Sequence, residues 1–270
     1  MIVFPNCKIN LGLFVTEKRE DGFHNLESIF IPVPCCDALE VVESNNGKIE
    51  FNVSGQIIDG ISDDNICMKA YRLLQKEFNL PAVQIHLRKQ IPMGSGLGGG
   101  SADGAFMLRL LNDLFNLKNT NTKLKYLASK LGSDCPFFID NTTAFVSGRG
   151  DKLESLHVDI SDMYIVLVHP KIHISTPQAY SLINPRSSGF NLKEIGTIKR
   201  QEWKTHLVND FEAPISEAYP IISQVKQSLY DKGAIYASMS GSGSAVYGLF
   251  EKEIHFEEDF TGLYMWCGKL

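Results

Sequence analysis

Residues 92–101 read Pro92-Met93-Gly94-Ser95-Gly96-Leu97-Gly98-Gly99-Gly100-Ser101, and this stretch decides how the chain is interpreted. Five of the seven positions from 94 to 100 are glycine. Because glycine has no Cβ atom, such a backbone can adopt positive φ angles and approach a ligand closely. The stretch therefore predicts a loop whose backbone N–H groups meet a bound ligand.

A helical pattern begins directly behind this loop. Its apolar residues recur at helical spacing and are Met107, Leu108, Leu111, Leu114 and Phe115. Ser101 is the expected N-cap residue, and Asp103 is expected in the first turn. The N-terminus of a helix carries partial positive charge and unsatisfied N–H groups, so the loop and helix together predict an anion site, most often for phosphate.

Other interpretations of the loop stay open at this point. Gly94, Gly96 and Gly99 also fit the G-x-G-x-x-G pattern of dinucleotide-binding folds, which would indicate an oxidoreductase. Pro92 and the mid-chain position of the motif argue against that reading. The usual phosphate-loop kinase pattern fails as well, because no Lys-Ser/Thr pair follows the last glycine. A flexible surface loop without a ligand is the plain structural alternative.

Composition describes an ordinary globular protein. The 270 residues are 44% hydrophobic and 21% charged, with a formal net charge of −5. This length favours two domains, which we expect to divide near residue 155 into 1–155 and 156–270. The negative balance argues against a general nucleic-acid or membrane-surface binder. An anionic substrate would have to be held by local groups.

Cysteine usage and the N-terminal sequence predict a cytoplasmic location. The six cysteines include no C-x-x-C pair and no zinc-ligand spacing, which favours thiols in a reducing compartment. Pro5, Asn6 and Lys8 stand where a signal peptide needs an apolar core. No apolar run is long enough to suggest a transmembrane helix. The sequence does not indicate the oligomeric state.

Hydrophobic periodicity predicts an α+β fold rather than a doubly wound parallel sheet. Strands are expected at 39–43 and 49–53, joined as a hairpin by Asn45-Asn46-Gly47. Asp63 and Asp64 precede a helical stripe from Ile66 to Phe78. The remaining expected elements are a strand at 83–87, a helix at 119–130, a strand at 144–146 with a turn at 148–150, a strand at 163–168, a polar and turn-rich stretch at 183–201, a helix at 210–229, and strands at 235–239 and 245–250.

Three further segments could carry chemistry. Lys8 and Asn10 share one face if they lie on a strand, where they could bind a phosphate and a hydroxyl. Asp134 stands directly before an apolar segment, which suits a general base. Ser240 to Ser244 form a second Gly-Ser loop with many hydrogen-bond donors. The plain alternatives are a surface lysine, a turn cap and a tight hairpin turn.

Taken together, these segments resemble the GHMP kinases, the family of galactokinase, homoserine kinase, mevalonate kinase and phosphomevalonate kinase. The matching motifs span nearly the whole chain in the family's order: Lys8-Ile9-Asn10-Leu11, Asp21-Gly22-Phe23-His24, Asp64-Asn65, Pro92 to Ser101, Asp134-Cys135-Pro136-Phe137-Phe138 and Ser240-Gly241-Ser242-Gly243. The resemblance implies a two-domain α+β fold, with an N-terminal ATP-binding domain, a C-terminal α/β domain and the active site in the cleft between them.

Within the family, the motifs are most similar to members that use ATP to phosphorylate the 2-hydroxyl of 4-diphosphocytidyl-2-C-methyl-D-erythritol in non-mevalonate isoprenoid biosynthesis. ATP is then the phosphate donor, and Mg²⁺ is expected with it, although no residue is indicated as its ligand. The alternatives are another kinase of the family, acting on homoserine or a mevalonate derivative, and a nucleotide-binding module without turnover.

The resemblance implies roles for individual residues. Asp134 occupies the position of the family's catalytic aspartate. Lys8 occupies the position of a lysine that contacts that aspartate and the reacting hydroxyl. ATP binding falls to Pro92, Met93, Gly94, Ser95, Gly96, Leu97, Gly98, Gly99, Gly100, Ser101, Ala102 and Asn65. Acceptor binding falls to Asn10, Phe23, His24, Tyr180, Gly241 and Ser242. Phe23 and Tyr180 would pack on the two faces of a cytosine ring, and His24 would bind the cytidine.

Three positions depart from the family pattern. Phe23 stands where tyrosine is usual, so it keeps the stacking face and loses the phenol hydroxyl. Cys7 and Cys135 replace the usual alanine and valine beside functional residues. Both are substitutions among small side chains and leave the implied roles in place.

Overall fold

The computed structural model describes residues 1–56, 64–254 and 260–270, so Asp63 lies outside it. The described chain packs as two compact units, each built from separate segments. The first unit comprises Met1–Cys7, Cys36–Met93 and Gly98–Thr142, and the second comprises Lys8–Cys35, Gly94–Leu97 and Thr143–Leu270. The glycine-rich run therefore contributes residues to both units.

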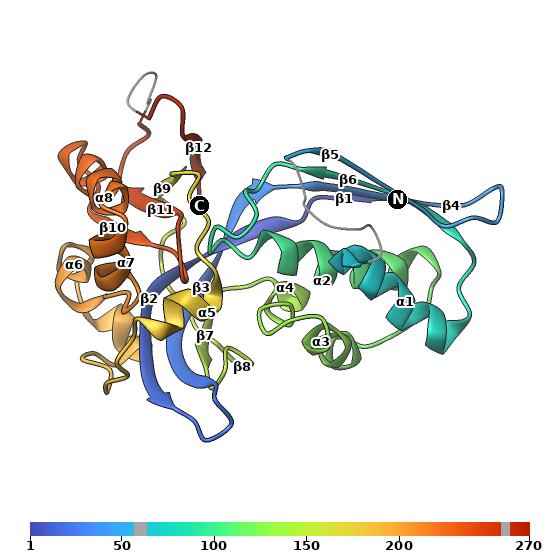
Figure 1. Cartoon of the computed structure of the whole chain (residues 1–270), viewed down its shortest axis with the longest axis horizontal. Coiled ribbons are helices and arrows are strands. Elements are labelled where there is room, and N and C mark those ends of the chain that lie inside the picture. The colour runs from blue at the N-terminus through green and yellow to red at the C-terminus, as the bar shows by residue number, and fades with distance from the viewer. Residues whose placement is uncertain (57–63, 255–259) are drawn as a thin grey trace. The chain divides into compact units, whose positions relative to one another are not determined.

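The first unit contains a four-stranded sheet (Figure 1). Its order is β1 (Ile2–Val3), β4 (Ala38–Glu43), β6 (Val83–Lys89) and β5 (Glu50–Gly55). The alternating pattern that predicted a strand at 83–87 is confirmed, since Val83, Ile85 and Leu87 are buried. Such alternation is typical of a strand with one face on a core.

The predicted hairpin between 39–43 and 49–53 is wrong. Strand β6 lies between β4 and β5, antiparallel to the first and parallel to the second. The turn residues at 45–47 predict only a local reversal of the chain. Strand β6 buries every second residue, whereas β5 is mostly exposed, so β6 takes the interior position and β5 the edge.

Helices α1 (Ile66–Phe78) and α2 (Gly99–Leu114) lie along one face of this sheet (Figure 1), and α3 (Asn121–Ser129) and α4 (Phe137–Asp140) pack beside α2. The apolar stripe predicted for α2 is confirmed, because Met107, Leu108 and Leu111 are buried. These side chains give the helix its fixed place on the sheet.

The start of α2 differs from the prediction. The N-cap residue is Gly98, which has φ 71° and makes no side-chain cap. Ser101 lies inside the helix, and Asp103 lies beyond its first turn and is buried. A residue with left-handed backbone begins the helix ahead of the expected serine, because glycine adopts that conformation without a Cβ clash.

The second unit contains two sheets with four strands each. One has the order β2 (Asn6–Lys18), β3 (His24–Cys36), β7 (Ala144–Ser147) and β8 (Lys152–Ser155), although the ends of β2 and β3 at residues 6–7 and 36 belong to the first unit. The other has the antiparallel order β10 (Tyr236–Met239), β11 (Val246–Phe250), β9 (Tyr164–His169) and β12 (Tyr264–Lys269). Mostly antiparallel sheets packed with helices confirm the α+β class.

The helices of the second unit are short. They are α5 (Thr176–Ser181), the 3₁₀ turns η2 (Leu192–Thr197) and η3 (Arg200–Glu202), α6 (Trp203–His206), α7 (Glu212–Ala218) and α8 (Ile221–Asp231). The single helix predicted at 210–229 is wrong, because it divides into α7 and α8. Pro220 stands at the N-cap of α8. A proline cannot donate a backbone N–H and clashes with the preceding turn, so α7 ends before it.

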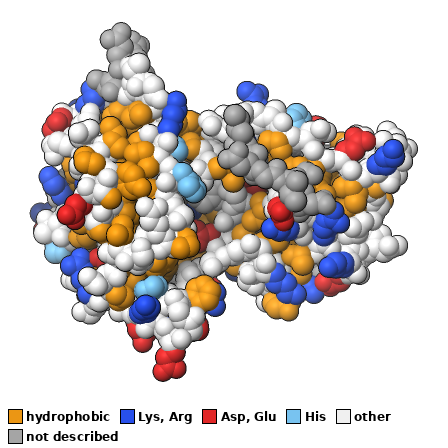
Figure 2. All heavy atoms as spheres, viewed as in Figure 1, with side chains coloured by type: hydrophobic (Ala, Val, Ile, Leu, Met, Phe, Trp, Pro, Cys, Tyr) orange, Lys and Arg blue, Asp and Glu red, His pale blue; other side chains and the backbone are white. Residues whose placement is uncertain are grey.

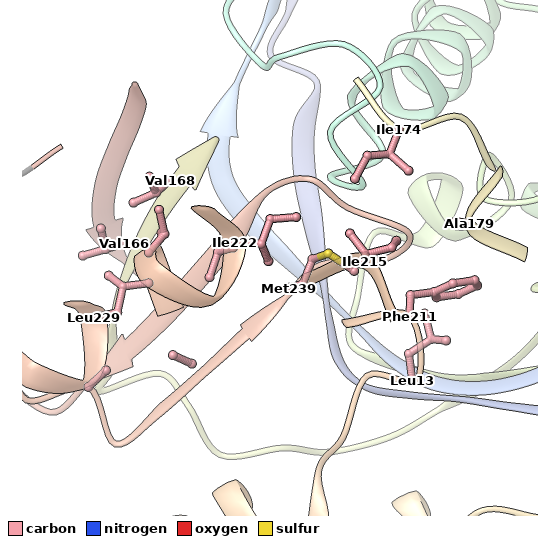
Figure 3. Packing of buried hydrophobic residues seen from close by; sticks show 14 of the residues in the cluster. Leu13, Val166, Val168, Ile174, Ala179, Phe211, Ile215, Ile222, Leu229 and Met239 are labelled. Atoms are coloured by element: carbon pink, nitrogen blue, oxygen red, sulfur yellow. The ribbon is translucent and has the colours of Figure 1, made fainter. Parts of the chain in front are cut away.

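One apolar cluster joins these elements in the second unit (Figure 3). It combines side chains of β2, β9, α8 and β10, among them Leu13, Val166, Leu229 and Met239. Burying a side chain of this size stabilises the folded state by about 1.5–3 kcal/mol. Met239 is the last residue of β10, so the core fixes the point at which the second Gly-Ser loop begins.

Candidate functional site

The two glycine-rich loops, which lie far apart in the sequence, pack against each other in the second unit. The hydroxyl of Ser240 donates to the carbonyl oxygen of Gly96 at 3.0 Å, and the N–H of Ala245 donates to the carbonyl oxygen of Ser95 at 2.9 Å. A Cβ atom on Gly96 would lie 2.0 Å from the carbonyl oxygen of Ser240. Only glycine fits at position 96 with this packing.

The rest of the glycine run forms the start of α2 in the first unit. Gly98 caps the helix, and the helix begins at Gly99. The first N–H groups of an α-helix have no acceptor within the helix, and the dipole makes this end partially positive. The 16-residue helix α2 therefore has a partially positive end that suits an anion, and the binding of an anion there stays a prediction.

Lys8 and Asn10 lie side by side in the buried first half of β2. Only 3% of Lys8 and 1% of Asn10 are exposed, so the surface-lysine alternative is wrong. The Nζ atom of Lys8 donates to Oδ1 of Asn10 at 2.6 Å and lies 4.4 Å from the centroid of the Phe30 ring. The expected shared face of the strand is confirmed.

The side-chain amide of Asn10 is oriented by Ser28 and Lys8, and the backbone of Asn10 is held by Tyr247. The Nδ2 atom of Asn10 donates to the hydroxyl of Ser28 at 2.9 Å, and that hydroxyl donates to the carbonyl oxygen of Gly12. The phenol of Tyr247 donates to the carbonyl oxygen of Asn10 at 2.7 Å. Burial raises the pKa of Tyr247, so the phenol keeps its proton. The hydrogen bond from Nδ2 to Ser28 keeps Oδ1 of Asn10 directed at Lys8.

Asn209 holds the second Gly-Ser loop and was not found from the sequence. Its Nδ2 donates to the carbonyl oxygens of Met239 at 2.7 Å and Gly241 at 2.9 Å. Its Oδ1 accepts from the N–H of Phe211 at 3.0 Å. Gly241 in turn lies against Gly96, since a Cβ there would be 3.1 Å from the Gly96 carbonyl oxygen. The predicted residues Gly241 and Ser242 thus belong to a loop with a fixed backbone.

Asp134 lies in the first unit, in the turn that leads into α4, and is partly exposed. Its neighbour Cys135 is buried, and loss of hydration raises the pKa of that thiol to about 12. The Ser101 side chain hydrogen-bonds Cys135 and opposes this shift, whereas the Asp134 carboxylate adds to it. Cys135 therefore stays a neutral thiol, hydrogen-bonded by Ser101 of α2.

The residues expected to bind the cytidine make two separate ring contacts in the second unit, one between His24 and Tyr180 and one between Phe23 and Arg149. The His24 ring stacks on the Tyr180 ring with centroids 4.7 Å apart, and Tyr180 meets Phe211 edge-on at 4.9 Å. Phe23 is 50% exposed, and the guanidinium carbon of Arg149 lies 3.5 Å from the centroid of its ring. Arg149 was not identified from the sequence. Burial and the charge of Lys18 lower the pKa of His24, so its ring is neutral at neutral pH.

Asn65 has a local structural contact. Its Oδ1 accepts from the N–H of Cys67 at 2.8 Å and caps the N-terminus of α1. An N-cap of this kind contributes about 1 kcal/mol to stability. The expected contact of Asn65 with ATP stays a prediction.

The described residues show no prebuilt metal centre and no membrane span. No group of three or more His, Cys, Asp or Glu in this part of the chain could hold a metal ion. Mg²⁺ bound with a nucleotide is held largely by phosphate oxygens and water, with one or two carboxylates, so it needs no such group. No helix in the described segments is long and apolar enough to cross a bilayer.

Charges of both signs are interspersed over the visible surface (Figure 2). A cavity of about 260 Å³ lies in the second unit, and Tyr164, Phe250 and Cys267 are among its lining residues. None of the predicted site residues lines this cavity. Within the second unit, the candidate site residues are therefore Gly94–Leu97, the Ser240–Ser244 loop and the Lys8–Asn10 pair, and not the residues that line this cavity.

Comparison with known families defines the class of protein. Residues 65–149 match the GHMP kinases N-terminal domain, and residues 190–260 match the GHMP kinases C-terminal domain. The chain belongs to the GHMP kinase family. The two matched regions lie on either side of residue 155, and the boundary itself stays a prediction.

Two relatives within the family are similar to this chain over nearly its whole length. The chain is 47% identical over 272 residues to a 4-diphosphocytidyl-2-C-methyl-D-erythritol kinase of Parabacteroides distasonis, with 100% of both chains covered. It is 50% identical over 255 residues to the kinase of that name from Bacteroides fragilis, with 94% of this chain and 93% of the relative covered.

Solved structures agree with these relatives. A crystal structure of 4-(cytidine 5'-diphospho)-2C-methyl-D-erythritol kinase matches with a TM-score of 0.80 and 30% identity, covering 92% of this chain and 90% of that one. A homoserine kinase from Cytophaga hutchinsonii matches with a TM-score of 0.66 and 16% identity, covering 93% and 85%. At that identity the second match reports a shared fold alone.

Proposed function

We propose that this chain is an ATP-dependent kinase that phosphorylates the 2-hydroxyl of 4-diphosphocytidyl-2-C-methyl-D-erythritol. The structural observation that carries the proposal is the packing of the glycine run on the Ser240–Ser244 loop in the unit that also buries the Lys8–Asn10 pair. The relatives named for this substrate, at 47% and 50% identity over nearly the whole chain, support the choice of acceptor.

Phosphate binding falls to backbone groups in this proposal. The glycine run carries no phosphate-loop lysine, so N–H groups of residues 94–101 and the dipole of α2 hold the phosphates. Mg²⁺, when bound with the nucleotide, neutralises phosphate charge. Phosphoryl transfer mainly needs charge stabilisation and in-line positioning, and these groups are suited to both.

The chemical step assigns roles to Asp134 and Lys8. The 2-hydroxyl oxygen forms a bond to the γ-phosphorus, the bond from that phosphorus to the β–γ bridging oxygen breaks, and ADP leaves. Asp134 accepts the hydroxyl proton as the oxygen attacks. The ammonium of Lys8 offsets negative charge on the transferred group, and Asn10 directs it through the hydrogen bond at 2.6 Å.

Acceptor recognition is assigned to Phe23, His24 and Tyr180, and also to Asn10, Gly241 and Ser242. The neutral imidazole of His24 can both donate and accept a hydrogen bond, which suits the edge of a cytosine. Because His24 covers one face of Tyr180, cytosine must use the other face of that ring or displace His24. The exposed Phe23 ring offers a second stacking surface.

The alternative acceptors within the family have weaker support. The homoserine kinase structure is 16% identical, and a mevalonate kinase structure from Methanococcus jannaschii is 11% identical with a TM-score of 0.72. We also propose a cytoplasmic location, where ATP is available and thiols stay reduced.

A coupled assay of ADP release tests the proposal. The purified chain would be supplied with Mg-ATP and, in separate reactions, with 4-diphosphocytidyl-2-C-methyl-D-erythritol, homoserine or mevalonate. We expect turnover with the first acceptor and at least 100-fold lower kcat/KM with the others. Preference for homoserine or mevalonate would refute the acceptor, and ATP binding without turnover on any of them would favour the non-catalytic module.

A further inference from the structure

A buried ionic cluster lies in the first unit, apart from the residues assigned above. It consists of Lys89 at the end of β6, Asp37 just before β4 and Asp103 on α2, each with at most 2% of its surface exposed. The Nζ atom of Lys89 donates to Oδ2 of Asp103 at 2.7 Å and also to Oδ2 of Asp37. One ammonium thus serves two carboxylates.

The cluster contacts the chain just before the glycine run and at Gly99, near the end of the run. Oδ1 of Asp37 accepts the N–H of Gln90 at 2.5 Å and the N–H of Ile91 at 2.9 Å, which fixes the backbone entering the loop. Within the run, a Cβ atom on Gly99 would lie 3.1 Å from Nζ of Lys89. The ammonium therefore lies directly beneath the first residue of α2.

The charges of the cluster do not balance if both carboxylates are ionised. Oδ1 of Asp103 is buried and has no hydrogen-bond partner in the described structure. Burial raises the pKa of Asp103 to about 7, and Asp37 adds to this shift, while Lys89 opposes it. The Cys67 thiol on α1 also faces the cluster and stays neutral, because burial raises its pKa. A proton on Asp103 relieves the excess negative charge.

An ion cluster of this kind is costly as a stabiliser. Apolar side chains of similar volume often give equal or greater stability than a buried ion pair, because the charges must lose their hydration. The cluster instead fixes the positions of backbone atoms. It accepts hydrogen bonds from the N–H groups of Gln90 and Ile91 and contacts Gly99 at the start of α2. Gln90 and Ile91 precede the residues assigned to the ATP phosphates, and Gly99 is one of those residues.

We propose that Lys89, Asp37 and Asp103 are positioning residues for the nucleotide, which fix the entry of the glycine loop and the start of α2 so that their N–H groups meet the phosphates. This inference rests on the proposed ATP-binding function of the loop. It assigns the three residues no contact with the acceptor and no part in the proton transfer.

The test measures the Kd of Mg-ATP by titration calorimetry and the KM of the acceptor in the coupled assay. Asp103→Ala removes the carboxylate that ties α2 to Lys89, and we expect at least a tenfold rise in the Kd of ATP with the acceptor KM within twofold of wild type. Asp103→Asn keeps an acceptor for Lys89 and is expected to restore the Kd to within threefold. A purely structural role would not divide the two substrates in this way.

A second variant guards against loss of folding. Lys89→Met/Asp37→Asn/Asp103→Leu removes all three ionisable groups together, while the amide introduced by Asp37→Asn keeps an oxygen for the N–H groups of residues 90 and 91. We expect this variant to melt as one cooperative unit and to bind ATP at least tenfold more weakly. The matched control is Glu77→Gln, which breaks the exposed pair with Lys123 and is expected to change neither constant.

The outcomes are separable. Wild-type ATP affinity in the folded triple variant, or equal losses for ATP and acceptor in Asp103→Ala, would overturn the positioning role. No ATP binding by the wild-type chain would instead refute the proposed function on which the inference rests.

Discussion

The carbonyl oxygen of Ser240 lies 2.0 Å from the point where a side chain on Gly96 would begin. Gly96 also has φ 81°, so both its neighbour and its backbone conformation exclude a larger residue. The two residues are 144 positions apart in the sequence. Their close packing fixes the glycine run against the Ser240–Ser244 loop within the second unit.

Gly96→Ala is therefore expected to displace one loop from the other. The Cβ atom would meet backbone, which cannot rotate away, so we expect at least a 100-fold loss of kcat/KM in the coupled assay. Gly47→Ala is the matched control, because Gly47 has a similar φ of 70° and open space around it. That substitution costs about 1–2 kcal/mol of backbone strain and should leave kcat/KM unchanged. Equal activity of the two variants would show that the loop contact is dispensable.

Asp134→Asn is expected to lower kcat by about 10²–10⁴-fold, because the hydroxyl then lacks a proton acceptor. Lys8→Met is expected to lower kcat by a similar factor, since the transferred phosphoryl group loses a nearby positive charge. The Kd of Mg-ATP, measured by calorimetry, should stay within threefold in Asp134→Asn.

The control for this pair is Asp140→Asn, which alters an exposed carboxylate on α4 that pairs with Lys125. It should keep wild-type kcat. If Asp134→Asn also turned over near the wild-type rate, Asp134 would not be the base, and a role in orienting the hydroxyl would have to be tested next.

Phe23→Ala and Tyr180→Ala are expected to raise the KM of the cytidylyl acceptor by about 10-fold or more and to leave the KM of ATP unchanged. Loss of stacking on a base costs about 1–3 kcal/mol, which corresponds to this range. Phe190→Ala is the aromatic control, because Phe190 packs on His206 and has no assigned role. Parallel increases in both KM values would indicate structural damage and remove these rings from acceptor binding.

Sequence periodicity predicted where individual helices and strands lie better than it predicted which strands pair with each other. The alternation at 83–87 appears in β6, and the stripe that begins at Met107 appears in α2, with Phe115 as the C-cap residue. Which strand pairs with which depends on burial across the whole sheet, so the hairpin at 45–47 was predicted wrongly. The break of the predicted helix at Pro220 had a local signal that the apolar pattern outweighed.

The candidate site shows the same division. Lys8 and Asn10 could be paired from the sequence because a strand repeats every two residues. Asn209 donates hydrogen bonds to the carbonyl oxygens of residues 239 and 241. Lys89 donates one to Asp37, which lies 52 residues away in the sequence. Contacts between positions so far apart leave no local pattern, so no spacing rule could have found them.

The buried carboxyl of Asp103 predicts a specific dependence of stability on pH. Burial raises its pKa from an ordinary value of about 3.9 to about 7. The folded state therefore binds a proton more tightly than the unfolded state, and the stability from this group is full below about pH 3.9, falls as the pH rises and is lost above about pH 7.

Asp103→Asn mimics the protonated form and cannot titrate. Its melting temperature should exceed that of wild type by an amount that grows between about pH 5 and pH 7 and is constant above about pH 8, as measured by differential scanning calorimetry. Glu77→Gln, at an exposed position on α1, should show a difference from wild type that does not grow with pH. A constant difference for Asp103→Asn across the range would mean that Asp103 stays ionised in the folded protein.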